Sequence, residues 1–169
     1  INVSRLLIID NYFMDYMKRY AAKHPAIVPR LLLEITEDNH FNVDELKLAM
    51  ENLQRLKQLG FKIAIDDFGT GYSGLNFIHQ HDFHTLKIDQ VFIKSLHQNS
   101  AITSVLVSMI KLAKQLNMRL IAEGVENQDQ VRELELLGVR YIQGFYYSEP
   151  MSVDAFFRFT LSAKQIAHR

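Results

Sequence analysis

Two adjacent aspartates, Asp66 and Asp67, follow a short apolar stretch and lead directly into a glycine-rich segment at residues 68–71. Side chains alternate between the two faces of a strand, so neighbouring acids cannot share a face while the strand stays regular. The glycines allow the chain to turn sharply at this point. Carboxylates at a strand end beside such a loop favour a site for a hard cation, and a solvated turn is the alternative for this pair taken alone.

Other polar residues stand at the ends of other apolar stretches: Glu34, Lys87, Glu123 and Gln143. A protein built only for packing has no reason to place an acid, an amide or an ammonium at one strand end after another. If the strands are parallel, their carboxyl ends meet at one edge of the sheet. These side chains would then gather there with the two aspartates.

Apolar periodicity predicts the elements that position these residues. Strand-like stretches cover residues 31–36, 61–65, 85–88, 118–122 and 139–142, and helix-like spacing covers 11–20, 43–59, 102–116 and 128–137. Alternating helices and buried strands predict an α/β fold with a parallel sheet. The regular length of the unit favours a TIM-like (β/α) barrel over an open sheet, with the site at the carboxyl ends of the strands.

Three of these units share a four-residue sequence pattern. Each places a helix-stopping Gly or Asn, an apolar residue, a cation and an apolar residue in succession, at residues 60–63, 117–120 and 138–141. The cations are Lys62, Arg119 and Arg140. The repetition supports a fold assembled from equivalent strand–helix units.

Several carboxylates at one mouth would repel one another, because two like charges ~4 Å apart cost about 4 kcal/mol at an effective dielectric of 20. Bound divalent cations remove that cost. No cluster of histidines accompanies these acids, so the ligands would be oxygens, which favours Mg²⁺, Mn²⁺ or Ca²⁺. Two such ions can activate a water and clamp a phosphodiester, and Lys87 would stabilise the phosphate or orient the water. The residues alone therefore predict metal-dependent hydrolysis of a phosphate ester.

The composition argues against several other classes of protein. The chain has 169 residues with 19 Lys+Arg and 19 Asp+Glu, so it lacks the basic excess of a protein that binds a nucleic acid polymer. It has no cysteine, which excludes disulfides, thiol catalysis and Cys-ligated metal. No apolar run approaches the ~20 residues of a membrane span. We expect one domain in the cytoplasm.

Six ordered motifs resemble those of the EAL-domain family. They are Asn-Val-Ser at residues 2–4, LEITE at 33–37, DDFGTGYS at 66–73, LKID at 86–89, AEGVE at 122–126 and QGFYYS at 143–148. The resemblance implies a bacterial (β/α) barrel with one antiparallel strand. It also implies hydrolysis of cyclic di-GMP to the linear dinucleotide pGpG with Mg²⁺ or Mn²⁺ in a two-metal site.

The same resemblance assigns metal ligands position by position. Asn2, Glu34 and Asp66 would ligate the first metal, with Asp66 bridging the two ions. Asp67 would serve the second metal. Glu123 would help to hold that metal or accept the proton of the attacking water.

Further residues would support this centre without ligating metal. Lys87 would position the attacking water, and Gln143 would support water or substrate. Glu37 would anchor the loop after the paired aspartates through Ser73, and Glu126 would have a similar supporting role. The aromatic residues 145–147 either pack in the core, which is the prediction, or line a guanine pocket.

One expected motif is absent. In the family, the Glu-Ala-Leu sequence lies upstream of the Asn-x-Ser element and supplies a ligand of the first metal, and this chain opens on that element. A full barrel needs ~250 residues, so we expect residues 1–169 to be a partial EAL domain without the first strand and helix. On their own these residues would have little or no activity.

Two other functions compete with the phosphodiesterase. A degenerate or truncated EAL domain could bind cyclic di-GMP, or a partner protein, without turnover, and the absent glutamate favours this alternative. An unrelated barrel with Lys87 as a Schiff-base nucleophile is the third. The resemblance also implies a homodimer and upstream sensor or GGDEF-type domains, in a parent protein that can be attached to a membrane.

Overall fold

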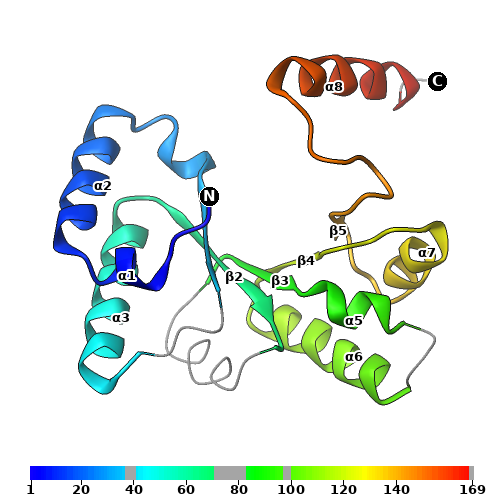
Figure 1. The fold of residues 1–169 in the computed structure, drawn as a ribbon, viewed down its shortest axis with the longest axis horizontal. Coiled ribbons are helices and arrows are strands. Elements are labelled where there is room, and N and C mark those ends of the chain that lie inside the picture. The colour runs from blue at the N-terminus through cyan, green and yellow to red at the C-terminus, as the bar shows by residue number, and fades with distance from the viewer. Residues whose placement is uncertain (37–40, 71–82, 97–99, 168–169) are drawn as a thin grey trace.

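In the computed structural model, a parallel sheet forms the centre of the fold. The structure describes residues 1–36, 41–70, 83–96 and 100–167, with the side chains of the last helix described to residue 160. Its five strands are β1 (Leu32–Thr36), β2 (Lys62–Phe68), β3 (Thr85–Ile88), β4 (Arg119–Ala122) and β5 (Tyr141–Ile142). They lie side by side in sequence order, and every pairing is parallel (Figure 1).

The first residues of the chain extend this sheet beyond β1. Asn2 pairs with Glu34 in a parallel bridge, held by hydrogen bonds of 2.9 Å from the Val3 amide to the Glu34 carbonyl and 2.9 Å from the Glu34 amide to the Ile1 carbonyl. The backbone pairing therefore places Asn2 of the Asn-x-Ser element beside Glu34, the first acid of LEITE.

Helices precede, connect and follow the strands, and the four that the sequence spacing predicts are among them. They are α1 (Arg5–Ile8), α2 (Asn11–Lys23), the 3₁₀ turn η1 (Val28–Arg30), α3 (Val43–Gln58), α5 (Gln90–Lys94), α6 (Ser100–Gln115), α7 (Gln128–Leu136) and α8 (Val153–Ala167). Helices α1 to α3 gather at one end of the sheet and α5 to α7 at the other (Figure 1).

Local sequence signals set the ends of the main helices. Asn42 and Asn127 begin α3 and α7 with reciprocal capping boxes, closed by Glu45 and Gln130 respectively. Residues with positive φ follow α3, α6 and α7, namely Gly60 (96°), Asn117 (54°) and Gly138 (81°). These left-handed positions confirm the predicted helix stops, because Gly and Asn are the residues that adopt them most readily.

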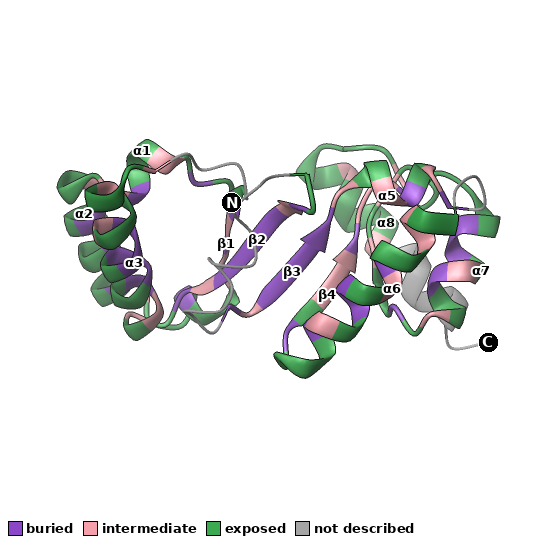
Figure 2. Ribbon diagram, turned by 90° about the horizontal axis from the view of Figure 1, so that it is seen from below, coloured by how far each residue is buried: buried purple, intermediate pink, exposed green. Residues whose placement is uncertain are grey.

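The core lies between the sheet and its helices. All four residues of β3 are buried, and β2 and β3 form the buried centre of the sheet in Figure 2. Leu53 and Leu56 of α3 and Leu106 of α6 are fully buried in the same apolar cluster. Helices α3 and α6 thereby fix β2 and β4, the strands that carry the acidic motifs.

Three details differ from the sequence-based expectations. Strand β2 does not end before the paired aspartates but runs through them to Phe68. The aromatic residues 145–147 are exposed rather than in the core. Helix α8 was not predicted, and its aromatic residues, including Phe156 and Phe157, are exposed because the helix stands away from the sheet (Figure 1).

No helix among the residues that the structure describes has both the length and the apolar character needed to cross a membrane.

Candidate active site at the carboxyl ends of the strands

The carboxyl ends of the strands bring the chemistry-bearing residues together. Lys87 of β3 lies at the centre, with its Nζ 2.7 Å from Glu123 Oε1, 2.8 Å from Asp66 Oδ1 and 3.2 Å from Glu34 Oε2. Its side chain is 5% exposed. One buried ammonium is therefore shared by three carboxylates from three different strand ends, which places residues far apart in the sequence in one cluster.

An irregularity in β2 aims both aspartates at this cluster. Asp67 has a left-handed φ of 54°, and the pairing with β3 shifts register between Ile65 and Phe68. Such a bulge re-aims a side chain that would otherwise point to the opposite face. The Asp67 amide also donates a 3.1 Å hydrogen bond to Asp66 Oδ1. The expectation that neighbouring acids need a break in the strand is therefore confirmed, but the break is a bulge within β2.

Gly69 holds the end of this strand close to two helices. It has a φ of 100°, and a Cβ added there would lie 2.3 Å from Met109 Cε of α6 and 2.7 Å from the ring of Phe92 in α5. Only a residue without a side chain allows this approach. The backbone that follows the aspartates thus packs closely against α5 and α6.

The donor set fits a divalent cation. Asp66, Asp67 and Glu123 each offer a carboxylate oxygen, and these oxygens lie within 4.8 Å of one another. Glu34 joins the cluster through Lys87, and Asn2 is its partner across the sheet. Carboxylate and amide oxygens are hard ligands that suit Mg²⁺ or Mn²⁺. Four carboxylates facing one ammonium leave a negative site, which a cation would neutralise.

Burial and charge shift the pKa values of three groups in the site. Burial disfavours the Lys87 ammonium, but its hydrogen bonds to Asp66 and Glu123 outweigh burial and raise its pKa above the ordinary value. Burial raises the pKa of Glu123 against the opposing effect of Lys87. Burial, then the charges of Asp66 and Asp89, raise the pKa of Asp67. Lys87 therefore stays charged, next to two acids, Asp67 and Glu123, whose pKa values are raised.

A cleft of about 270 Å³ opens beside these acids. Asp67, Glu123 and Gln143 line it together with Phe145, whose ring is 63% exposed. Gly144 lets the β5 loop approach the site, because a Cβ there would lie 2.1 Å from the Val125 carbonyl oxygen. The cleft places a polar amide and an accessible aromatic ring next to the carboxylates.

Asp89, for which the motifs predicted no role, also lines this cleft. Its Oδ1 accepts a 2.7 Å hydrogen bond from the Val91 amide at the start of α5, and its carboxylate contributes to the raised pKa of Asp67. The signal was present, because Asp89 directly follows the predicted strand at residues 85–88 and is therefore another acid at a strand end.

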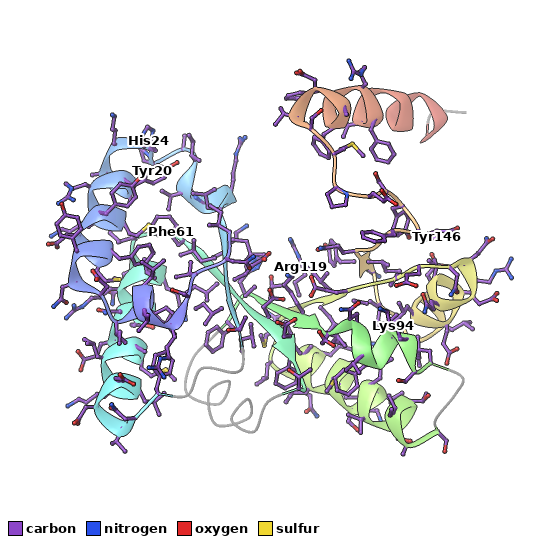
Figure 3. The ribbon with its side chains drawn as sticks, in the orientation of Figure 1. Tyr20, His24, Phe61, Lys94, Arg119 and Tyr146 are labelled. Carbon is purple, nitrogen blue, oxygen red and sulfur yellow. The ribbon has the colours of Figure 1, made fainter. Side chains whose placement is uncertain are left out.

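The remaining site candidates divide between described and undescribed residues. Glu126 lines the cleft but pairs with Lys94 of α5 at 3.4 Å, with both side chains about half exposed (Figure 3). Glu37 and Ser73 lie outside the described residues. The predicted roles of all these residues, like those of the acids, stay predictions.

Comparison with known proteins agrees with this geometry. The family model for the EAL domain matches residues 1–150, so the chain belongs to the EAL-domain family. It is 33% identical over 166 residues to the probable cyclic di-GMP phosphodiesterase PdeG of Escherichia coli (strain K12). The match covers 98% of this chain and 32% of that protein, so the chain spans about a third of this curated relative.

Solved EAL structures share the fold. The EAL domain of Mycobacterium smegmatis DcpA matches 97% of this chain and 72% of its own with a TM-score of 0.85 and 32% identity. Klebsiella pneumoniae BlrP1, in a complex with manganese and cyclic di-GMP, matches 89% of this chain and 38% of its own, with a TM-score of 0.77 and 27% identity. The TIM-like α/β fold class is thereby confirmed.

Proposed function

We propose that the protein containing this chain is a metal-dependent phosphodiesterase that hydrolyses cyclic di-GMP to linear pGpG. The convergence of Asp66, Asp67 and Glu123 around Lys87 is the single observation that carries the proposal. Similarity to proteins named for cyclic di-GMP hydrolysis or bound to that nucleotide supports the choice of substrate.

The metal ligands would divide between two ions. Asn2, Glu34 and Asp66 would hold one, and Asp66, Asp67 and Glu123 would hold the other, with Mg²⁺ or Mn²⁺ as the cation. When bound, the ions would polarise the phosphate oxygens and make a bound water more acidic. A manganese complex of a relative supports this assignment.

The side chains of the chain would orient and deprotonate the attacking water. Lys87 would hold the water by a hydrogen bond, and the neighbouring Glu123 carboxylate would accept its proton. The water oxygen would bond to phosphorus as the bond from phosphorus to the 3′ oxygen breaks. The released 3′ oxygen would take a proton from solvent, which leaves a 5′ phosphate and a 3′ hydroxyl, as in pGpG.

The cleft beside the acids would receive the rest of the substrate. Gln143 would hydrogen bond to the nucleotide, and the exposed ring of Phe145 would stack on a guanine. Glu126 would support this rim through Lys94. We further propose that residues 1–169 form part of one EAL domain, and that homodimerisation and attached sensor domains follow the family pattern.

The full-length protein can test this function with cyclic di-GMP, Mn²⁺ and separation of the products by chromatography. We expect pGpG to form, EDTA to stop the reaction and added Mn²⁺ to restore it. Glu123→Gln should abolish turnover, while Asp129→Asn, on the exposed face of α7, should not. Tight binding of cyclic di-GMP with no pGpG at high protein concentration would establish the receptor alternative instead.

A further inference from the structure

The amino ends of the strands carry charge of the opposite sign to the carboxyl ends. Lys62 and Arg119 are the first residues of β2 and β4, His84 precedes β3, and Arg140 precedes β5. Lys62, Arg119 and Arg140 are the three cations of the repeated sequence pattern, and His84 lies at the same ends of the strands. Parallel pairing in sequence order places them along one edge of the sheet, opposite the edge that holds the carboxylates.

A cavity of about 790 Å³ opens at this basic edge, beside β4 and β5. Its lining includes Lys114 from the last turn of α6, Arg119 and Arg140, with an apolar wall that includes Leu120 and Ile142. Protein sites for small molecules typically have volumes of about 300–1,000 Å³. The cavity is therefore larger than a single phosphate needs and has the size for a nucleotide.

The three cations of the cavity are available for a ligand. Among the described residues, Lys114, Arg119 and Arg140 form no ion pair with a carboxylate, and Glu135 is the one acid in the described lining. Helices α6 and α7 also end here, each with a partial charge of about −0.5. The cavity still keeps an excess of roughly one positive charge after these are subtracted.

A neighbouring histidine reports the same potential. The pKa of His84 is lowered, first by burial and then by the positive charges of Lys62 and Arg119. Protonation of the His84 imidazole is thus disfavoured, as expected for a partly buried group beside two cations.

Aromatic rings complete the lining. The guanidinium of Arg119 (labelled in Figure 3) lies 4.6 Å from the centre of the Tyr141 ring at the start of β5. Tyr141 and Tyr147 both line the cavity and are each about half exposed. Arginine and lysine bind phosphate oxygens, and tyrosine rings stack on nucleobases. We propose that this cavity binds a nucleotide with two or more phosphates, held by Lys114, Arg119 and Arg140, with its base beside Tyr141 and Tyr147.

This site is independent of the proposed phosphodiesterase. It lies at the other ends of the strands, and none of its lining residues belongs to the acidic cluster. Without divalent metal the acidic cluster is negative and repels nucleotides, so EDTA separates the two sites in a binding experiment.

The test is calorimetric titration of the full-length protein in EDTA with GTP, ATP or sodium pyrophosphate. We expect saturable binding of a nucleoside triphosphate that weakens as salt is added. Arg119→Gln and Arg140→Gln should each weaken it about tenfold, the effect of one charge-assisted hydrogen bond. The matched control is Lys111→Gln, on the exposed face of α6 one turn before Lys114, which should change the affinity less than about twofold.

Thermal unfolding of each variant distinguishes loss of the site from loss of the fold. Because these side chains are exposed, we expect the melting temperature to stay close to that of the wild type. Two results would overturn the proposal: no saturable binding of either nucleotide in the millimolar range, or binding that Arg119→Gln and Arg140→Gln leave intact. Pyrophosphate that binds as tightly as the nucleotides would overturn the role of the tyrosines, which Tyr141→Leu tests directly.

Discussion

Asp66 and Asp67 are adjacent in the chain and yet present their carboxylates to the same site, with oxygens within 4.8 Å of each other. The left-handed φ of 54° at Asp67 makes this possible. Two like charges held this close cost free energy, so the backbone conformation and the acidity of the site are coupled. Both depend on the residue at position 67, so different substitutions there can remove the charge with or without disturbing the backbone.

Asp67→Asn should separate the two effects. Asn adopts positive φ at least as readily as Asp, so the melting temperature should not fall. The loss of a carboxylate ligand should lower Mn²⁺ affinity or turnover by at least ~100-fold. This is more than the ~10–100-fold effect usual for residues that only hydrogen bond to a metal ligand. Calorimetric Mn²⁺ titration and a turnover assay measure this. Unchanged Mn²⁺ affinity would show that Asp67 is not a ligand.

Asp67→Val is the matched control for the backbone. A β-branched residue at φ 54° is strained, so this variant should lose stability as well as metal affinity. If Asp67→Val melted at the same temperature as Asp67→Asn, the bulge would not depend on the residue at this position.

Lys87→Met should destabilise the protein in EDTA by about 3–5 kcal/mol, because it leaves three clustered carboxylates without their shared cation. Saturating Mn²⁺ should recover more stability in this variant than in the wild type, since the metal then provides the missing positive charge. Urea unfolding with and without Mn²⁺ measures both effects.

The matched control is Lys94→Met, which removes the half-exposed pair with Glu126. Exposed pairs contribute about 0–1 kcal/mol, so this variant should be close to the wild type in both conditions. Equal losses in the two variants would mean that Lys87 is no more than an ordinary ion-pair partner.

The sequence predicted the strands, the main helices and the edge of the sheet where polar residues meet, because periodicity and helix-stopping residues are local signals. It did not place the bulge at Asp67 within β2, and it could not show that Gly69 lies close to Phe92 and Met109, because these contacts join residues distant in the sequence. It also missed α8, although apolar residues of this helix such as Phe156 and Phe159 recur at helical spacing. The sequence predicted that Lys87 and the acids gather at one place. It could not predict the three individual ion pairs of Lys87, because these contacts depend on the folded sheet.

Gly144→Ala tests the close approach of the β5 loop to the site. The new methyl would lie 2.1 Å from the Val125 carbonyl oxygen and 2.3 Å from its amide nitrogen, so backbone must move. We expect a loss of at least ~2 kcal/mol, in the range of overpacked sites, and weaker substrate binding because Gln143 moves with its neighbour. Urea unfolding and the Michaelis constant are the measurements.

Gly60→Ala gives the contrasting case. Gly60 has φ 96° but its nearest contact for a Cβ is Val28 at 3.5 Å, so only backbone strain of about 1–2 kcal/mol applies. The Michaelis constant should not change, because Gly60 precedes the amino end of β2, at the opposite ends of the strands from the acidic cluster. A change in both variants alike would point to a general loss of stability as the cause.

His84 should make stability fall as the pH drops below about 6.5, its ordinary pKa. Burial and the charges of Lys62 and Arg119 lower its pKa in the folded protein, so the unfolded chain binds the proton more readily. The stabilisation by neutral His84 is present above pH 6.5 and is lost as the pH falls towards the lowered pKa. Urea unfolding between pH 5 and 7.5 should show that the free energy of unfolding depends less steeply on pH in His84→Gln than in the wild type. NMR titration of Lys62→Met should show a His84 pKa that is higher than in the wild type. If the His84 titration curve of Lys62→Met were identical to that of the wild type, the charge of Lys62 would not contribute to the lowered pKa of His84.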